Sequence, residues 1–79
     1  MILTVEYNAK GFVEIYMDEE GRRLLIDSLR RLRAQESKGD HDHLMTPSWA
    51  GNELTEEKQG DADNELIHQL NIILLPKRG

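Results

Sequence analysis

Two histidines in an H-x-H spacing, His41 and His43, are the residues of this chain whose types point most directly to a metal site. On a strand this spacing puts both imidazoles on one face, and zinc accepts ligands from histidine and carboxylate side chains. Asp40 or Asp42 would supply an oxygen, and His68 would add an imidazole from a later strand. His68 falls on a strand face that we expect to be core, so a hydrogen-bonded structural histidine is the alternative interpretation.

The same segment holds the ingredients of a nucleophile, a base and an orienting acid in Ser48, Thr46, His43 and Asp42. Successive side chains on a strand point to opposite faces, so these neighbours are not expected to converge. The chain has no G-x-S-x-G, P-loop or glycine-rich dinucleotide motif. The sequence therefore predicts no enzymatic activity, no catalytic residue, no metal site and no cofactor.

Trp49 offers a third kind of chemistry, because it follows Pro47 and is flanked by small residues in a segment rich in carboxylates. Tryptophan is enriched at the centres of protein interfaces, although an indole packed as a core plug beneath the loop is the alternative. An aromatic anchor with an acidic rim suits a basic protein surface, since complementary charge speeds association and fixes register. We expect the partner-binding residues to be Asp40, Asp42, Trp49, Glu53, Glu56 and Glu57.

Charge is distributed unevenly along the chain. The formal net charge is -5, and residues 36–65 hold nine acidic residues and two lysines, so the remainder carries +2. This balance argues against general nucleic-acid binding, which needs a basic surface. The acidic region predicts a basic protein partner; a solvated acidic loop that keeps the protein soluble is the alternative.

Composition also predicts a compartment. The chain has no cysteine, which excludes disulfides and thiol nucleophiles and fits a reducing environment. Its first residues lack the basic and apolar regions of a signal peptide, and no apolar stretch approaches the roughly 20 residues that cross a bilayer. We expect a cytoplasmic protein that binds neither membranes nor nucleic acid and forms a single domain over residues 1–79.

The elements that position these residues follow from periodicity. Residues 2–7 and 12–17 alternate in polarity around "NAKG" and predict a β-hairpin. Asp18 is a suitable N-cap for a helix over residues 19–35, with Leu25, Leu29 and Leu32 forming its apolar stripe. Residues 41–46 and 65–75 predict a short and a long strand, and residues 55–64 predict an exposed, mobile loop.

The resulting ββαββ order predicts an α+β fold in which one helix packs on one face of a four-stranded, mainly antiparallel sheet. The opposite sheet face would carry polar side chains that meet water or a partner: Thr4, Glu6, Glu14, Gln69 and Asn71. One alternative function is a metal- or ligand-binding module using His41, His43 and His68. Another is an accessory subunit whose open sheet edge or polar sheet face pairs with another chain or with itself.

The segment "GDHDHLMTPSWAGNEL" (residues 39–54), followed by "TEEKQG" and "LIHQLNIILLP", resembles the immunity protein 32 family of bacterial polymorphic toxin systems. The resemblance implies an α+β antitoxin that binds a cognate toxin and blocks it sterically, and it carries over no catalytic residues. Many toxins of such systems are nucleases, whose basic clefts an acidic surface would suit. Ala50 is a departure, because another glycine is expected at that position.

Overall fold

The N-terminal hairpin has the predicted form in the computed structural model, which describes residues 1–78. Strand β1 (Leu3–Asn8) pairs antiparallel with β2 (Phe12–Met17), and Leu3 lies opposite Met17. The turn between them uses Gly11 at a φ of 101°, and the Gly11 N–H donates to the Asn8 carbonyl at 2.8 Å. Glycine adopts this backbone conformation without steric cost.

Helix α1 (Glu19–Arg31) begins where the sequence predicts, because the Asp18 carboxylate accepts the Gly21 N–H at 2.8 Å. It ends four residues before the predicted boundary at residue 35. The Arg33 N–H donates at 3.0 Å to the Asp40 carboxylate, so a residue from the following strand replaces the helical carbonyl acceptor. The buried side of the helix carries Gly21 and Ser28, while Leu29 of the predicted stripe is exposed.

The predicted long strand over residues 65–75 is two strands. β4 (Glu65–Ile67) pairs antiparallel with β1, and β5 (Gln69–Leu74) pairs antiparallel with β3 (Asp40–Met45). The break is at His68, whose carbonyl accepts the Thr46 N–H at 2.9 Å and whose Nδ1 lies 2.6 Å from Thr46 Oγ1. These bonds hold the bend that transfers the chain from one sheet to the other.

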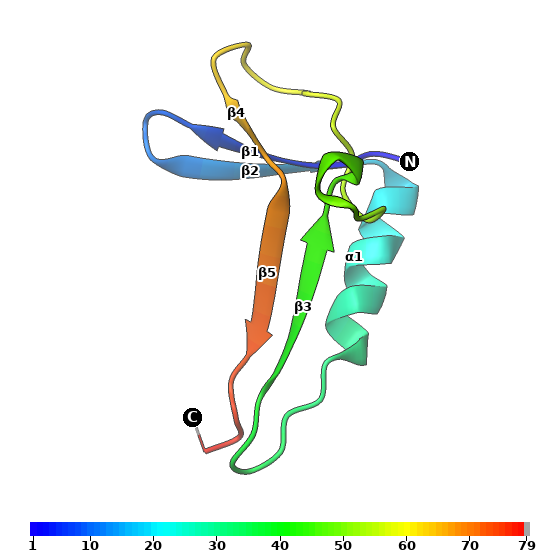
Figure 1. Ribbon diagram of the computed structural model, residues 1–79, viewed down its shortest axis with the longest axis vertical. Helices are drawn as coiled ribbons and strands as arrows, with labels where there is room; N and C mark the ends of the chain where they lie inside the picture. The colour runs from blue at the N-terminus through cyan, green and yellow to red at the C-terminus, as the bar shows by residue number, and fades with distance from the viewer. Residues whose placement is uncertain (79) are drawn as a thin grey trace.

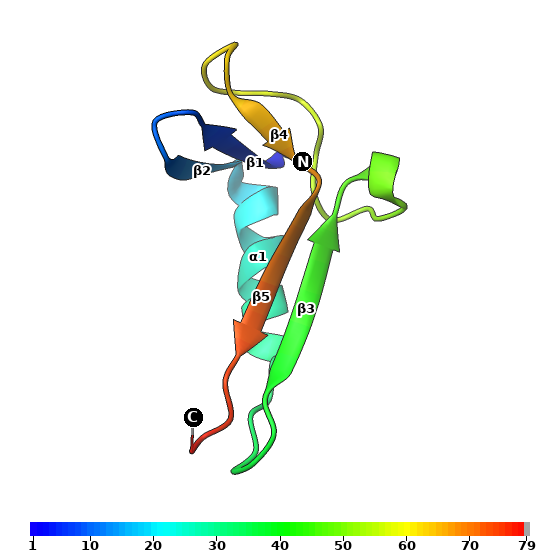
Figure 2. The same ribbon diagram turned by 60° about the vertical axis from the view of Figure 1, so that its left-hand side comes forward.

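The α+β class is therefore confirmed, but the predicted single four-stranded sheet is wrong. Within residues 1–78, five strands form a three-stranded sheet in the order β2-β1-β4 and a two-stranded sheet, β3-β5 (Figure 1). The hairpin projects at one end, at a steep angle to β3 and β5, and α1 runs along the two-stranded sheet (Figures 1 and 2). The molecule is elongated, with extents of 43 × 27 × 22 Å.

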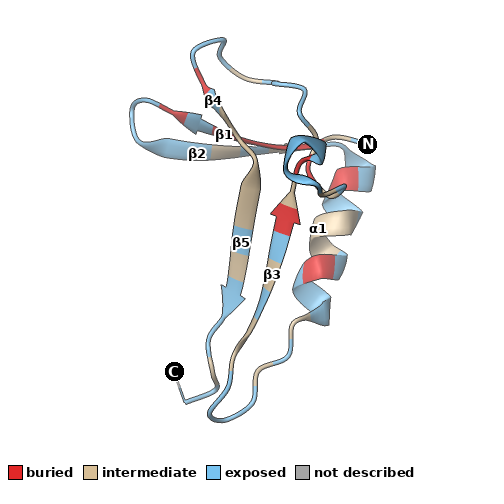
Figure 3. Cartoon of the chain, in the orientation of Figure 1, coloured by how far each residue is buried: buried red, intermediate tan, exposed pale blue. Residues whose placement is uncertain are grey.

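The core is small and lies where the two sheets meet the helix (Figure 3). Its fully buried apolar side chains are Leu3, Val5, Leu44 and Leu54. Partly buried apolar residues pack against them from α1, β4 and β5: Leu24, Leu25, Ile67, Leu70 and Ile72. Within residues 1–78, no helix combines the length and apolar character needed to cross a membrane.

The polar face of β1 is covered by the chain itself, which corrects the expectation that Thr4 and Glu6 meet water or a partner. Residues 55–64 cross this face, and both side chains are completely buried. Thr4 Oγ1 donates to the Glu57 carbonyl at 3.0 Å. The Glu6 carboxylate accepts the Gln59 N–H at 2.6 Å and the Asn64 side-chain amide at 2.9 Å. The segment expected to be a mobile loop thus supplies the donors that a buried carboxylate requires.

The net effect of these contacts on Glu6 is a lowered pKa. Burial of Glu6 raises its pKa and is the largest single influence. Hydrogen bonds from the Asn64 side chain and the Gln59 and Gly60 backbone favour the ionised form, with a smaller contribution from Lys58, and together they outweigh burial. The carboxylate is therefore held charged beneath residues 55–64.

Candidate partner-binding site

Trp49 lies in a compact turn after β3 that begins with the short 3-10 helix η1 (Pro47–Trp49). The Trp49 and Gly51 N–H groups both donate to the Thr46 carbonyl, at 2.9 and 3.0 Å. The indole is 54% exposed, so the core-plug alternative is wrong. It stacks on the His68 imidazole with ring centroids 5.6 Å apart and ring planes 7° from parallel. Residues 46–54 are called the Trp49 turn below.

Two of the predicted carboxylates hold this turn in shape. Glu53 accepts the Met45 N–H at 2.9 Å and the Asn52 N–H at 3.3 Å. Glu56 accepts the Ser48 N–H at 2.7 Å. Hydrogen bonds from the Ser48 side chain and its backbone lower the pKa of Glu56, despite the opposing effect of desolvation. Glu56 remains exposed, whereas Glu53 is half-buried.

Asp40 and Asp42 lie away from the Trp49 turn and face α1. Asp40 starts β3 and accepts the Arg33 and His41 N–H groups at 3.0 and 2.8 Å, which lower its pKa. The Asp42 carboxylate oxygen Oδ2 lies 3.9 Å from Nη2 of the Arg31 guanidinium group. Both carboxylates are engaged within the chain, so the structure does not bring them together with Trp49.

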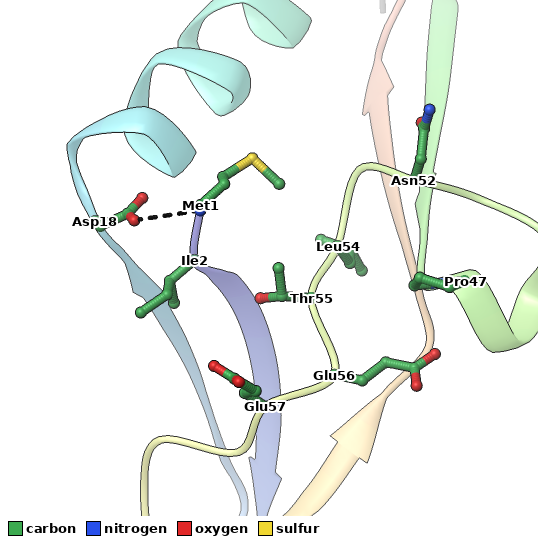
Figure 4. A pocket seen from close by; sticks show the side chains of 9 residues that line it. All are labelled: Met1, Ile2, Asp18, Pro47, Asn52, Leu54, Thr55, Glu56 and Glu57. Atoms are coloured by element: carbon green, nitrogen blue, oxygen red, sulfur yellow. Dashed lines mark ion pairs between the residues drawn. The ribbon is translucent and has the colours of Figure 1, made fainter.

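An open cleft of about 760 Å³ borders the Trp49 turn (Figure 4). Pro47, Leu54, Glu56 and Glu57 line it on one side, and the start of the chain lines it on the other. Glu56 and Glu57 point to opposite sides of their segment (Figure 4). Glu57 is exposed. Asp18, which also lines the cleft, has its pKa lowered by backbone hydrogen bonds from Ile2 and Gly21.

No sequence pattern predicts the other wall of this cleft. Met1, Ile2 and Asp18 reach it because the Thr55 N–H donates to the Leu3 carbonyl at 2.8 Å, which joins segments more than fifty residues apart. The amino group of Met1 lies 3.8 Å from the Asp18 carboxylate and 3.5 Å from Glu20. The cleft thus combines apolar side chains with carboxylates from both walls.

The histidines do not form one cluster. His41 and His43 lie on the face of β3 directed away from Asp40 and Asp42, exposed, with ring centroids 5.0 Å apart. His68 is bonded to Thr46 and stacked on Trp49. Among residues 1–78, no three histidine, aspartate or glutamate side chains are grouped so that they could hold a metal ion.

The comparisons with known proteins identify a family for this chain. The model of the family described as Immunity protein 32 matches residues 13–70, a range that contains most of β2 and all of α1, β3, the Trp49 turn and β4. Neither curated proteins nor solved structures give a match to this chain. The matched range covers well over half of the 79 residues, and the chain belongs to the immunity protein 32 family.

Proposed function

We propose that this immunity protein binds a cognate bacterial toxin in the cytoplasm and neutralises it sterically, as a binding protein rather than an enzyme. The contact surface is the Trp49–acid surface, which we define as Trp49, Glu53, Glu56 and Glu57. The observation that carries the proposal is the exposed indole of a hydrogen-bonded turn beside an open cleft that carboxylates border.

Trp49 supplies the apolar part of the proposed contact. An exposed indole leaves a large apolar surface in water, and burying it against a partner releases free energy. The Trp49 turn is already fixed by its own hydrogen bonds, so little conformational entropy is lost when a partner binds. A rigid aromatic residue of this kind is typical of an interface hot spot.

The carboxylates define the chemistry of the partner. Glu56 and Glu57 are both exposed and line the cleft. Lysine or arginine side chains of a partner would complement these two carboxylates. A nuclease toxin, whose substrate cleft is basic, is the partner that this surface fits best. Asp40 and Asp42 face α1, and in this proposal they position β3 and add to the negative potential instead of touching the toxin.

The test is the affinity of purified variants for a candidate toxin encoded beside this gene, measured by calorimetry. Trp49→Ala and Glu57→Lys should each weaken binding by about tenfold or more. Glu36→Lys makes the same charge change in the exposed loop at the far end of the molecule and should leave affinity nearly unchanged. Circular dichroism establishes that each variant is folded.

Unchanged affinity in both folded site variants would rule out the Trp49–acid surface. Co-expression gives a second readout, because the unaltered chain should restore growth to cells that make the toxin and Trp49→Ala should not. Association of the unaltered chain should also slow as salt concentration rises, since salt screens charge attraction between the two proteins.

A further inference from the structure

Strand β2 forms the outer edge of its sheet. Among residues 1–78 its strand neighbour is β1, and Figure 2 shows β2 at the outside of the molecule, away from β4. The strand reads "FVEIYM" and contains neither proline nor lysine, residues with which monomeric proteins commonly block such edges. Its outer backbone groups are therefore available to another strand.

The side chains of this edge are unusually apolar for a surface strand. Val13, Ile15 and Met17 share one face and are 56%, 42% and 39% exposed. They lie beside Tyr7, Val5 and Leu3 of β1 in the register of the hairpin. Leu3 and Val5 belong to the buried core, whereas Val13, Ile15 and Met17 do not. These three side chains therefore form an exposed apolar strip along β2.

We propose that two copies of this chain pair through their β2 strands, antiparallel about a twofold axis at Ile15, to form a six-stranded sheet. Residues opposite each other in an antiparallel pair share a face. With Ile15 opposite Ile15 of the second copy, Val13 lies opposite Met17 of that copy and the apolar strips join. On the other face, Glu14 lies opposite Tyr16 of the second copy, so no two carboxylates face each other there; within each chain Glu14 already accepts the Asn64 side-chain amide at 3.2 Å.

Neighbouring registers are unfavourable. A twofold axis at Glu14 places two carboxylates opposite each other, which is destabilising. A shift by one residue places Glu14 opposite Ile15 and mixes the polar and apolar faces. Of the registers compared, the axis at Ile15 is the one that joins the apolar faces without opposing two carboxylates, and this is why the proposed occupant of the edge is a second copy of the chain.

Charge complementarity at the ends of the strands supports the same arrangement. Lys10 lies in the exposed turn before β2. After β2 come the N-cap Asp18 and the first residues of α1, Glu19 and Glu20, an acidic start that the Met1 amino group neutralises in part. The antiparallel register brings Lys10 of each copy beside this acidic start in the other. Two such contacts offset part of the repulsion between chains that each carry a net charge of -5.

The first test is the molar mass in solution, measured by analytical ultracentrifugation over a range of concentrations. The unaltered chain should reach twice its 9.1 kDa mass. Ile15→Lys puts two ammonium groups at the axis and should raise the dimer dissociation constant by about tenfold or more. Ile73→Lys is the matched control, because Ile73 is 67% exposed on β5, outside the proposed interface. A monomer at every concentration, or a folded Ile15→Lys variant that dimerises like the control, would overturn the proposal.

The second test reads the register. The chain has no cysteine, and opposite residues of an antiparallel pair have Cα atoms about 4.5–5.5 Å apart, within the range that a disulfide spans. Ile15→Cys should cross-link on oxidation. Val13→Cys alone should not, whereas a mixture of Val13→Cys and Met17→Cys chains should. Cross-linking of Val13→Cys with itself, without the mixed disulfide between Val13→Cys and Met17→Cys chains, would overturn the register.

Discussion

The Trp49 indole stacks on the His68 imidazole, with ring centroids 5.6 Å apart and planes 7° from parallel. The two residues come from different parts of the chain, since His68 marks the bend between β4 and β5 and Trp49 ends η1. Thr46 completes the arrangement by bonding to both the backbone and the ring of His68. The exposed aromatic side chain of the proposed interface is therefore oriented by the residue that transfers the chain between sheets.

His68→Ala should loosen Trp49 without unfolding the protein. Loss of the ring stack should cost about 0.5–1.5 kcal/mol, and the loss of the bond to Thr46 adds to this. We expect the near-ultraviolet circular dichroism of the single tryptophan to weaken while the far-ultraviolet spectrum is retained. His41→Ala is the control, because His41 lies on the exposed outer face of β3, away from Trp49; an unchanged tryptophan signal in His68→Ala would contradict this account.

Ala50→Gly should stabilise the protein. Ala50 is the non-glycine residue with positive φ, 68°, within residues 1–78, and it stands where the family resemblance predicts a glycine. Left-handed backbone costs an alanine roughly 1 kcal/mol relative to glycine, partly offset by the greater freedom of glycine in the unfolded chain. The midpoint of thermal unfolding should therefore rise by a few degrees. Ala34→Gly, at a position without positive φ, should show no such gain, and a fall in the midpoint for Ala50→Gly would refute the argument.

Gly21→Ala should destabilise the protein, although helix propensity alone predicts the opposite by about 1 kcal/mol. Gly21 is buried, and a methyl group built on it would overlap the Ile2 carbonyl oxygen. Relief of that overlap requires the chain start to move away from α1, at a cost of about 1–3 kcal/mol. Urea unfolding measures the change. An increase in unfolding free energy would show that propensity outweighs the close approach.

Glu6 should make the free energy of unfolding depend on pH. Its pKa lies below the ordinary 4.5, so the unfolded chain binds this proton more tightly than the folded one. The stabilising contribution is present above pH 4.5 and is lost as pH falls through the lower folded value. Glu6→Gln should lower the unfolding free energy at pH 7 by about 1–3 kcal/mol, because an amide N–H₂ faces backbone donors, and it should flatten the decline below pH 4.5.

The flattening should be partial, because Asp18, Asp40 and Glu56 also have lowered pKa values and keep their own acid dependence. Glu65→Gln is the control, since Glu65 is exposed. The measurement is a series of urea unfolding curves between pH 3 and 7. If the free energy of unfolding falls as steeply below pH 4.5 in Glu6→Gln as in the unaltered chain, the buried carboxylate does not govern that fall.

Local patterns in the sequence determined the hairpin, the start of α1 at Asp18 and the turn at Pro47, because alternation, an N-cap and a missing N–H act over a few neighbouring residues. They also located the acidic region and its single tryptophan. The family resemblance on residues 39–54 agrees with the match to residues 13–70.

Only the tertiary structure decided where the long C-terminal strand breaks, which carboxylates remain at the surface, and that Trp49 is exposed. The alternation of side chains along the strand continues through His68, so no local pattern marks the bend. The bend is held instead by hydrogen bonds to Thr46, twenty-two residues earlier. Residues 55–64 look like a solvent-exposed loop until Glu6, more than fifty residues away, provides the acceptor for their N–H groups. A buried polar group is stabilised by hydrogen-bond partners that the fold brings to it from distant parts of the chain. Such partners follow no periodic pattern in the sequence, so local patterns do not predict them.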